Sequence, residues 1–243
     1  MGHNVPVPPA LHFEPAANAR PLTELPLLIV VGLTGVGKTS FTRALGWPAL
    51  PNRRALVDRF VLPRLGADPA RLDRADRFAL TARWRAGHPG GLAEALAAAY
   101  AAPTWPLVFD GLRGEAEVRF AHERFPRARF AVLEAPVAVR LERLLGRREG
   151  FDRIAVRPEE VARFRELAGG VLEPGALDRL LGRGYPLEQL VAKLKIVAEE
   201  QKNYHPEGPR RALAGSERAL FLDTAAQDPA AIAARVRTWL GEA

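Results

Sequence analysis

Eight consecutive residues, numbers 32–39, constrain this chain more than any other segment. They read Gly-Leu-Thr-Gly-Val-Gly-Lys-Thr and match the pattern G-x-x-x-x-G-K-[ST] at every fixed position. Residues 27–31 before them are wholly apolar and mostly aliphatic, which is typical of a strand buried on both faces of a parallel sheet. The residues after Thr39, up to Gly46, favour a short helix. The sequence therefore predicts a strand, a glycine-rich turn and a helix in direct succession.

The chemistry of this turn suits a polyphosphate. Three glycines allow the backbone to curl until successive N–H groups point at phosphate oxygens, and the helix adds the positive end of its dipole. We expect Lys38 to reach the β- and γ-phosphates and the Thr39 hydroxyl to ligate Mg²⁺. A glycine-rich turn that binds nothing is the alternative. We favour a site for ATP and Mg²⁺ formed by Gly32, Leu33, Thr34, Gly35, Val36, Gly37, Lys38, Thr39 and Ser40.

Further short apolar runs at 55–57, 107–109, 130–133 and 219–222 alternate with helical patterns. This alternation predicts an α/β fold with three layers and about five mostly parallel strands covered by helices on both faces. We expect residues 1–24, which are polar and rich in proline, to form a disordered tail. Residues 25–243 then form one domain with helical insertions at about 59–105 and 147–215. Apolar residues at helical spacing predict an amphipathic helix over 186–204.

Two aspartates follow apolar runs and become candidates for the same site. Asp110 ends the run 106–109, where a carboxylate at the tip of a neighbouring strand would hold the hydration shell of Mg²⁺. A helix cap or a turn is the alternative, because Gly111 follows. Asp58 ends the run 55–57 and would bind an acceptor hydroxyl or take its proton. A residue at the turn after a strand explains Asp58 equally well.

Three stretches resemble the nucleoside- and nucleotide-monophosphate-kinase-like branch of the P-loop NTPases, which includes adenylate, shikimate and dephospho-CoA kinases. The segment Asp-Gly-Leu-Arg at 110–113, followed by a helix at 115–125, is similar to the Asp-Gly-Phe-Pro-Arg segment of adenylate kinases. Residues 143–148, Arg-Leu-Leu-Gly-Arg-Arg, resemble the start of their lid, and residues 222–224 resemble their last strand and adenine-side loop. The likeness covers about residues 25–153 and 219–240.

The resemblance implies roles for four arginines. Arg113 would bind the acceptor's phosphate, Arg143 would lie against the adenine, and Arg147 or Arg148 would clamp the transferred phosphoryl group. Arginines on a closing lid stabilise the charge that phosphoryl transfer spreads over the γ-oxygens. An exposed helix face paired with nearby acidic residues is the alternative for the whole run of arginines.

The two insertions depart from this family. The lid is enlarged into a mostly helical block, and residues 59–105 carry no signature of a known acceptor. Five residues of that segment would line an acceptor pocket or, equally well, a helix surface: Arg77, Arg83, Trp84, Arg85 and His88.

Composition narrows the class of protein. The chain has no cysteine, which excludes disulfides, thiolate catalysis and cysteine-based metal sites. No apolar run reaches the roughly 20 residues of a membrane helix, and no signal peptide is recognisable, so we expect a cytoplasmic protein. The formal net charge is +7, but nearly all basic residues are arginines scattered among acids, as on a solvated surface.

Together these features predict a phosphotransferase that passes the ATP γ-phosphoryl group to a nucleotide or another small acceptor. Lys38, Asp110, Arg147 and Asp58 are the expected catalytic residues. A second hypothesis is an ATP-dependent switch whose helical block contacts a protein or nucleic acid. A kinase acting on polynucleotide ends is a third.

Overall fold

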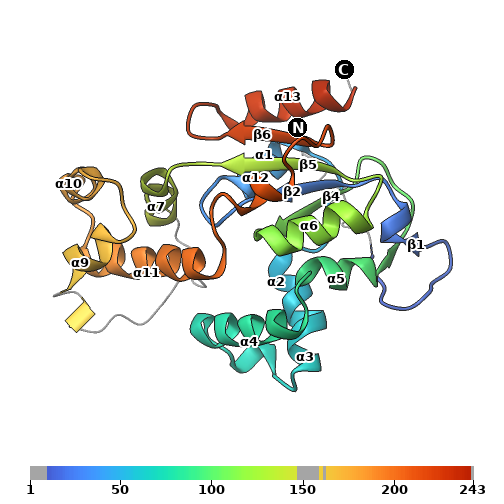
Figure 1. Cartoon of the computed structure of the whole chain (residues 1–243), viewed down its shortest axis with the longest axis horizontal. Coiled ribbons are helices and arrows are strands. Elements are labelled where there is room, and N and C mark those ends of the chain that lie inside the picture. Colours follow the sequence, from blue (N-terminus) through green and yellow to red (C-terminus); the bar gives the residue numbers. More distant parts are fainter. Residues whose placement is uncertain (1–9, 147–158, 161–162, 242–243) are drawn as a thin grey trace, which may run out of the picture.

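The computed structural model describes residues 10–146, 159–160 and 163–241. At its centre lies a sheet of four parallel strands in the order β4-β2-β5-β6 (Figure 1). The bounds of these strands are Leu28–Val31 for β2, Val108–Leu112 for β4, Arg129–Glu134 for β5 and Ala219–Asp223 for β6. The strand that leads into the glycine-rich turn is therefore internal, with a neighbour on each side.

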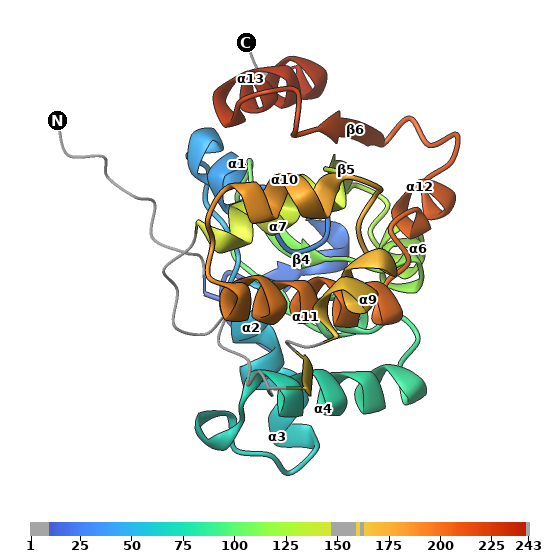
Figure 2. The ribbon, with the colours of Figure 1, turned by 90° about the vertical axis from the view of Figure 1, so that its left-hand side faces the viewer.

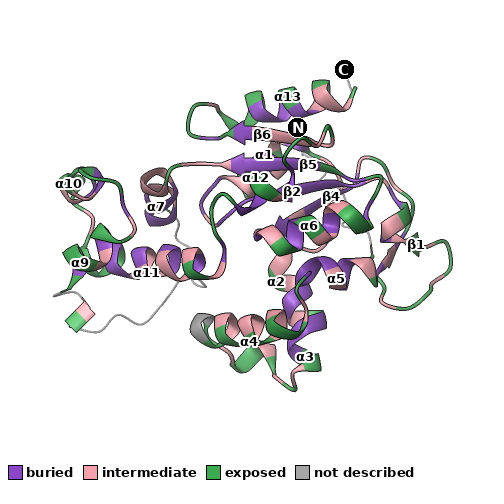
Figure 3. Ribbon diagram, in the orientation of Figure 1, coloured by how far each residue is buried: buried purple, intermediate pink, exposed green. Residues whose placement is uncertain are grey.

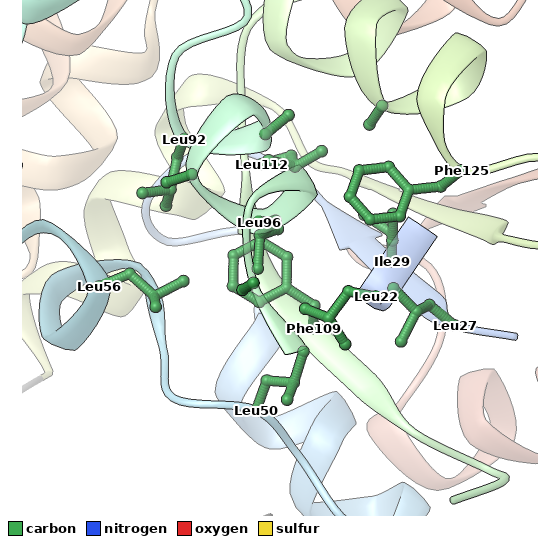
Figure 4. Close-up of a cluster of buried hydrophobic side chains, with 14 of the residues drawn as sticks. Leu22, Leu27, Ile29, Leu50, Leu56, Leu92, Leu96, Phe109, Leu112 and Phe125 are labelled. Carbon is green, nitrogen blue, oxygen red and sulfur yellow. The ribbon is translucent and has the colours of Figure 1, made fainter. Parts of the chain in front are cut away.

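Alternate residues of the strands point to opposite faces of the sheet and build two separate cores. On one face, Ile29, Phe109 and Phe130 join a core that also holds residues of α5 (Leu92–Ala97) and α6 (Glu115–Arg124); Figure 4 shows part of it. On the other face, Val30 and Ala131 pack with α1 (Lys38–Leu45) and α13 (Pro229–Leu240). The predicted three-layer α/β architecture is confirmed.

The prediction of a strand at 55–57 is wrong. These residues belong to a helix, α2 (Arg53–Leu56), which continues into a π-helical segment, η2 (Val57–Val61), and α3 (Leu62–Arg64). The Asn52 side chain caps this helix by accepting a hydrogen bond from the Ala55 N–H. Leu56 and Phe60, four residues apart, are both buried, so the apolar pattern is helical once it is followed past residue 57. In place of a full strand, the outer edge of β4 carries an isolated parallel bridge from Ala49 to Val108.

The tail expected at 1–24 is folded where the structure describes it, from residue 10 onward. Strand β1 (Arg20–Pro21) pairs antiparallel with β3 (Tyr100–Ala101), and a 3-10 turn, η1 (Leu22–Glu24), follows. Leu11 and Leu22 are buried in the core beside α5. The prolines suggested disorder, but these two leucines bury enough apolar surface to hold the segment in place.

A helical block extends from one end of the sheet, on the left in Figure 1 and facing the viewer in Figure 2. It comprises α9 (Phe164–Gly169), α10 (Ala176–Gly182) and α11 (Leu187–Asn203), and it packs on α7 (Val137–Leu145). Residues of all four helices form a small core of their own, and their outer surfaces are exposed (Figure 3). The predicted amphipathic helix over 186–204 is confirmed as α11.

The remaining elements are short or peripheral. Helix α4 (Arg74–Gly87) follows a 3-10 turn, η3 (Pro69–Arg71), and α12 (Gly208–Ala212) leads from α11 to β6. Among the helices that the structure describes, none combines the length and the apolar character needed to cross a membrane.

Candidate functional site

The glycine-rich turn lies at the carboxyl end of β2, in the middle of the sheet. From β2 the chain moves to β4 on one side and then crosses to β5 on the other. In an open parallel sheet, ligands bind outside the carboxyl ends of the strands where the strand order reverses in this way. Topology therefore places the turn where such a fold accommodates a ligand.

Two glycines of the turn have backbone requirements that no other residue meets well. Gly35 has a φ of 86°, and a Cβ atom there would lie 2.7 Å from the carbonyl oxygen of Arg140. Gly37 has a φ of 94° and precedes the first residue of α1. Positive φ values are accessible to glycine at little cost. The loop thus packs tightly against α7 immediately before α1 begins.

The Lys38 ammonium group is hydrogen-bonded to the backbone of its own loop. Its Nζ donates hydrogen bonds to the carbonyl oxygens of Gly32 at 2.8 Å and Leu33 at 3.1 Å. An ammonium group has three hydrogens, so one donor is left for a phosphate oxygen. Burial lowers the pKa of Lys38 from 10.5 to about 8, although the nearby Asp110 carboxylate opposes the shift. A phosphate beside this ammonium would favour its charged form.

Asp110 lies on β4, opposite Val30 of β2, and one of its carboxylate oxygens is buried without a hydrogen-bond partner. Strand β4 continues to Leu112, three residues beyond the end of the predicted apolar run at 109, so Asp110 is within the strand rather than after it. The Thr39 side chain is exposed at the start of α1. An unpaired carboxylate oxygen and a free hydroxyl fit Mg²⁺, which prefers oxygen ligands and keeps several waters. No cluster of three or more acidic or histidine ligands occurs among the described residues, so a metal here would rely on phosphate and water oxygens.

A residue that sequence reasoning missed, Glu200 on α11, binds the loop directly. Its carboxylate accepts hydrogen bonds from the Thr34 backbone N–H at 2.9 and 3.0 Å and from the Thr34 hydroxyl at 2.7 Å. Glu200 is fully buried. A signal was present, because Glu200 follows Val197 by three residues and so falls on the apolar face of an amphipathic helix. An acidic residue on such a face requires a buried partner.

Two arginines neutralise Glu200. Arg113 donates to one carboxylate oxygen at 2.9 Å and Arg140 to the other at 2.5 Å. Burial alone would raise the pKa of Glu200, but these two guanidinium groups and the Thr34 hydrogen bonds lower it. Arg140 also donates to the carbonyl oxygen of Thr34 at 2.8 Å, so this buried arginine ties α7 to the loop.

Arg143 links the loop to the segment after the last strand. Its guanidinium donates to the Gly35 carbonyl at 3.4 Å and to the Thr224 hydroxyl at 2.9 Å. The Thr224 hydroxyl in turn donates to the Val36 carbonyl at 2.8 Å. Contact with an adenine stays a prediction for Arg143. Arg147 and Arg148, the predicted clamp, lie outside the described residues.

Asp58 is not at the end of a strand, so the geometric reason for placing it in the site is lost. It lies within η2 and forms an ion pair with Arg77 of α4, and Arg54 is 3.8 Å away. The carboxylate already has cationic partners and joins α2 and η2 to α4. We withdraw it as a catalytic base.

A second polar network surrounds Tyr204, which follows α11. Arg53 donates two hydrogen bonds to the buried Glu117 carboxylate, both at 2.9 Å, and one to the Tyr204 hydroxyl at 2.7 Å. Arg85 of α4 also donates to the Tyr204 hydroxyl and to Asn203. Arg85 therefore belongs to the interior of the site, whereas its neighbour Arg83 is exposed on the helix surface.

The comparisons with known proteins give likenesses among solved structures. A sugar kinase from Janibacter sp. HTCC2649 has a TM-score of 0.42 at 17% identity and covers 90% of this chain and 96% of its own. A sulfotransferase from Alicyclobacillus acidocaldarius has a TM-score of 0.42 at 14% identity over 90% and 81% of the two chains. A shikimate kinase from Bacteroides thetaiotaomicron has a TM-score of 0.39 at 13% identity over 89% and 98%. Likenesses of this size do not establish an activity. Neither a family model nor a curated protein matches the chain.

Proposed function

We propose that this protein is an ATP-dependent phosphotransferase of the P-loop type that phosphorylates a nucleotide or another small molecule. The observation that carries the proposal is the loop itself. Gly32 to Thr39 curls between an internal parallel strand and a helix N-terminus, with one donor of Lys38 unused. A glycine-rich turn, the N-terminus of a helix and a lysine ammonium are the groups that bind phosphate in proteins, and all three are present in this segment.

Mg²⁺ fits the donor set beside the loop. The buried, unpaired oxygen of Asp110 and the exposed Thr39 hydroxyl would hold it, partly through water. When bound, the ion supplies charge neutralisation at the phosphates. In this arrangement Lys38 would hold the terminal phosphate, and the partly buried Arg113 would orient the acceptor.

The reaction is a transfer of the γ-phosphoryl group to an acceptor oxygen. The bond between the γ-phosphorus and the oxygen that bridges it to the β-phosphate breaks, and ADP leaves with that oxygen. A bond forms from the same phosphorus to the acceptor, and a hydroxyl acceptor releases its proton to water. Lys38 and, by resemblance, Arg147 or Arg148 would stabilise the charge on the transferred group.

A screen with γ-labelled ATP tests the proposal. Nucleosides, nucleotides, sugars and small hydroxy acids are offered as acceptors to the wild-type chain and to Lys38→Ala. Transfer of label to one acceptor class by the wild type alone supports a phosphotransferase. Release of label only as free phosphate, across the whole panel, refutes it.

A second function is favoured by one observation, the contact of Glu200 with Thr34. Through this contact the helical block touches residues 32–39, which we call the phosphate loop. ATP binding would therefore alter the position of α11 if Thr34 turned toward a phosphate. An ATP-dependent switch acting on a protein or nucleic acid would use such a link. Hydrogen exchange of α9 to α11 with and without Mg²⁺ and an ATP analogue tests it. Unchanged exchange throughout the block rules against a switch.

A further inference from the structure

Each hydrogen-bonding group of Thr34, the third residue of the phosphate loop, is paired with a side chain from a distant part of the chain. The backbone N–H and the hydroxyl both donate to Oε1 of Glu200, at 2.9 and 2.7 Å. The carbonyl oxygen accepts from Nε of Arg140 at 2.8 Å. A threonine has no other N–H or O–H hydrogen, so Thr34 has no donor left for a phosphate oxygen.

The two side chains that hold Thr34 also bind each other. Arg140 donates to the second carboxylate oxygen of Glu200 at 2.5 Å, and the two side chains are 2% and 0% exposed. Water cannot replace a lost partner in the interior, so a change in the geometry of either charge is costly. Helices α7 and α11 therefore fix the peptide groups on both sides of the Thr34 Cα atom.

The loop beyond Thr34 has the opposite character. A set of N–H groups there has no acceptor among the described residues: those of Gly35, Gly37, Lys38, Thr39 and Ser40. The Val36 carbonyl, in contrast, accepts from the Thr224 hydroxyl at 2.8 Å. Unpaired N–H groups of a glycine-rich turn and of the first turn of a helix are the donors that bind phosphate in proteins. The donors available to a phosphate therefore begin after Thr34.

We infer that Glu200 and Arg140 are positioning residues for a triphosphate, and that Thr34 is their point of attachment to the loop rather than a phosphate ligand. With Thr34 fixed, the N–H groups beyond it need no ordering when the nucleotide binds, and a site formed in advance binds more tightly. The docking of α11, which carries Glu200, becomes a condition for nucleotide binding (Figure 2). The inference deepens the proposed function and rests on it for the nucleotide, but not for the acceptor.

A double-mutant cycle between Glu200 and Thr34 tests the inference. Calorimetry measures the affinity for a non-hydrolysable ATP analogue and for tripolyphosphate, both with Mg²⁺; tripolyphosphate reports on the loop without an adenine. Glu200→Asp keeps the charge beside the arginines but draws it back from Thr34 by one methylene group, and Thr34→Val removes the hydroxyl alone. We expect each variant to weaken both affinities by about fivefold. In the Glu200→Asp background, Thr34→Val should weaken them by no more than about twofold, because the contact is already lost.

Matched variants separate positioning from general stability. Thr34→Ser keeps the hydroxyl and should retain the wild-type affinities to within about twofold. Thr238→Val is the control on α13, where the exposed hydroxyl donates to the Ala234 carbonyl of the same helix, and its affinities should equal those of the wild type. Hydrogen exchange of the wild type adds a measurement that needs no variant. Exchange in α11 should stay the same or slow down when the analogue binds.

Three results would overturn the inference. A loss from Thr34→Val that is equal in both backgrounds would mean that the hydroxyl contacts a phosphate itself. Wild-type affinities in both Thr34→Val and Glu200→Asp would mean that the contact serves the fold alone. Faster exchange in α11 on binding would mean that Glu200 leaves the loop, as a switch requires.

The same measurements keep the inference apart from the proposed function. Label transfer in the acceptor screen by a protein that gives any of these three results would refute only the inference. A coupled cycle in a protein that transfers label to no acceptor would refute only the phosphotransferase. A wild type that binds neither the analogue nor tripolyphosphate would refute both.

Discussion

Glu200 holds Thr34 by its backbone and its side chain together, although 166 residues separate the two in the sequence. Both carboxylate oxygens contact the Thr34 N–H, at 2.9 and 3.0 Å, and one also accepts from the hydroxyl at 2.7 Å. Thr34 is the third residue of the phosphate loop, and Glu200 lies near the end of the helix that closes the helical block. The shape of the loop therefore depends on a distant insertion.

Glu200→Gln should lower the free energy of unfolding by about 3–5 kcal/mol, because it leaves the buried Arg140 and the partly buried Arg113 without a counter-charge. Denaturant unfolding followed by circular dichroism measures the change. Glu199→Gln is the matched control, since its half-exposed carboxylate pairs with Lys202 and accepts from the Asn203 amide within the same helix and contacts no buried charge in the described part of the chain. A loss below about 0.5 kcal/mol in Glu199→Gln is expected. Equal losses in the two variants would show that the buried network is not the source of stability.

Acid should destabilise the protein through its two buried carboxylates. The pKa values of Glu117 and Glu200 are both lowered in the folded state, chiefly by arginines acting against the effect of burial. A lowered folded-state pKa stabilises the protein above the unfolded value of about 4.3, and this contribution is lost as the pH falls below it. The stability difference between the wild type and Glu200→Gln should therefore narrow from pH 6 to pH 3. A constant difference over that range would contradict the assignment.

The affinity of the protein for an ATP analogue in the presence of Mg²⁺ should fall as the pH rises past about 8. Lys38 has a pKa of about 8 in the free protein, so above that pH it must take up a proton to bind phosphate as an ammonium. The affinity then decreases by up to about tenfold per pH unit. Calorimetry in buffers of different ionisation enthalpy measures the proton uptake. Lys38→Arg, which stays charged, should show no such uptake; a proton taken up by that variant as well would assign the effect to another group.

Asp110→Asn should weaken magnesium-dependent binding of an ATP analogue by about tenfold while leaving stability unchanged. The carboxylate oxygen that the variant replaces has no hydrogen-bond partner to lose within the described residues. Titration with Mg²⁺ at a fixed analogue concentration measures the effect, and chelation of the metal should abolish the difference from wild type. Asp178→Asn, an exposed aspartate of the helical block, is the control. Identical magnesium titrations for wild type and Asp110→Asn would remove Asp110 from the metal site.

Gly35→Ala should destabilise the protein more than Gly46→Ala does. Both glycines have positive φ values, 86° and 66°, so both substitutions carry the left-handed penalty of about 1–2 kcal/mol. Only at Gly35 does the new methyl group also meet backbone, at 2.7 Å from the Arg140 carbonyl oxygen; nothing lies within 4 Å at Gly46. Thermal unfolding with and without the ATP analogue compares them. Equal melting temperatures would mean that the loop can move away from α7.

The phosphate loop could be predicted because all its parts are contiguous. An apolar strand, three glycines, a lysine and a helix follow one another within 19 residues, and short-range sterics decide the turn. The same holds for α11, whose apolar spacing predicts its bounds to within one residue. Asp58 was misplaced because a run of three apolar residues at 55–57 fits both a strand and a helix. The tertiary structure distinguishes the two: Leu56 and Phe60, four residues apart, pack in the same core, as residues on one side of a helix do.

The sequence alone thus determined where the strand, the glycine-rich turn and the helix lie and that parallel strands carry the turn, since these follow from residues close together in the chain. The tertiary structure alone decided that Arg53, Arg85 and Arg140 join the site and that the acids Glu117 and Glu200 meet arginines there. The sequence does not distinguish Arg83 from Arg85, because both are arginines on the same helix. They lie on different sides of α4, and only Arg85 is on the side that faces the end of α11. Contact with Glu200, 87 residues away, positions Arg113, and contact with Tyr204, 119 residues away, positions Arg85.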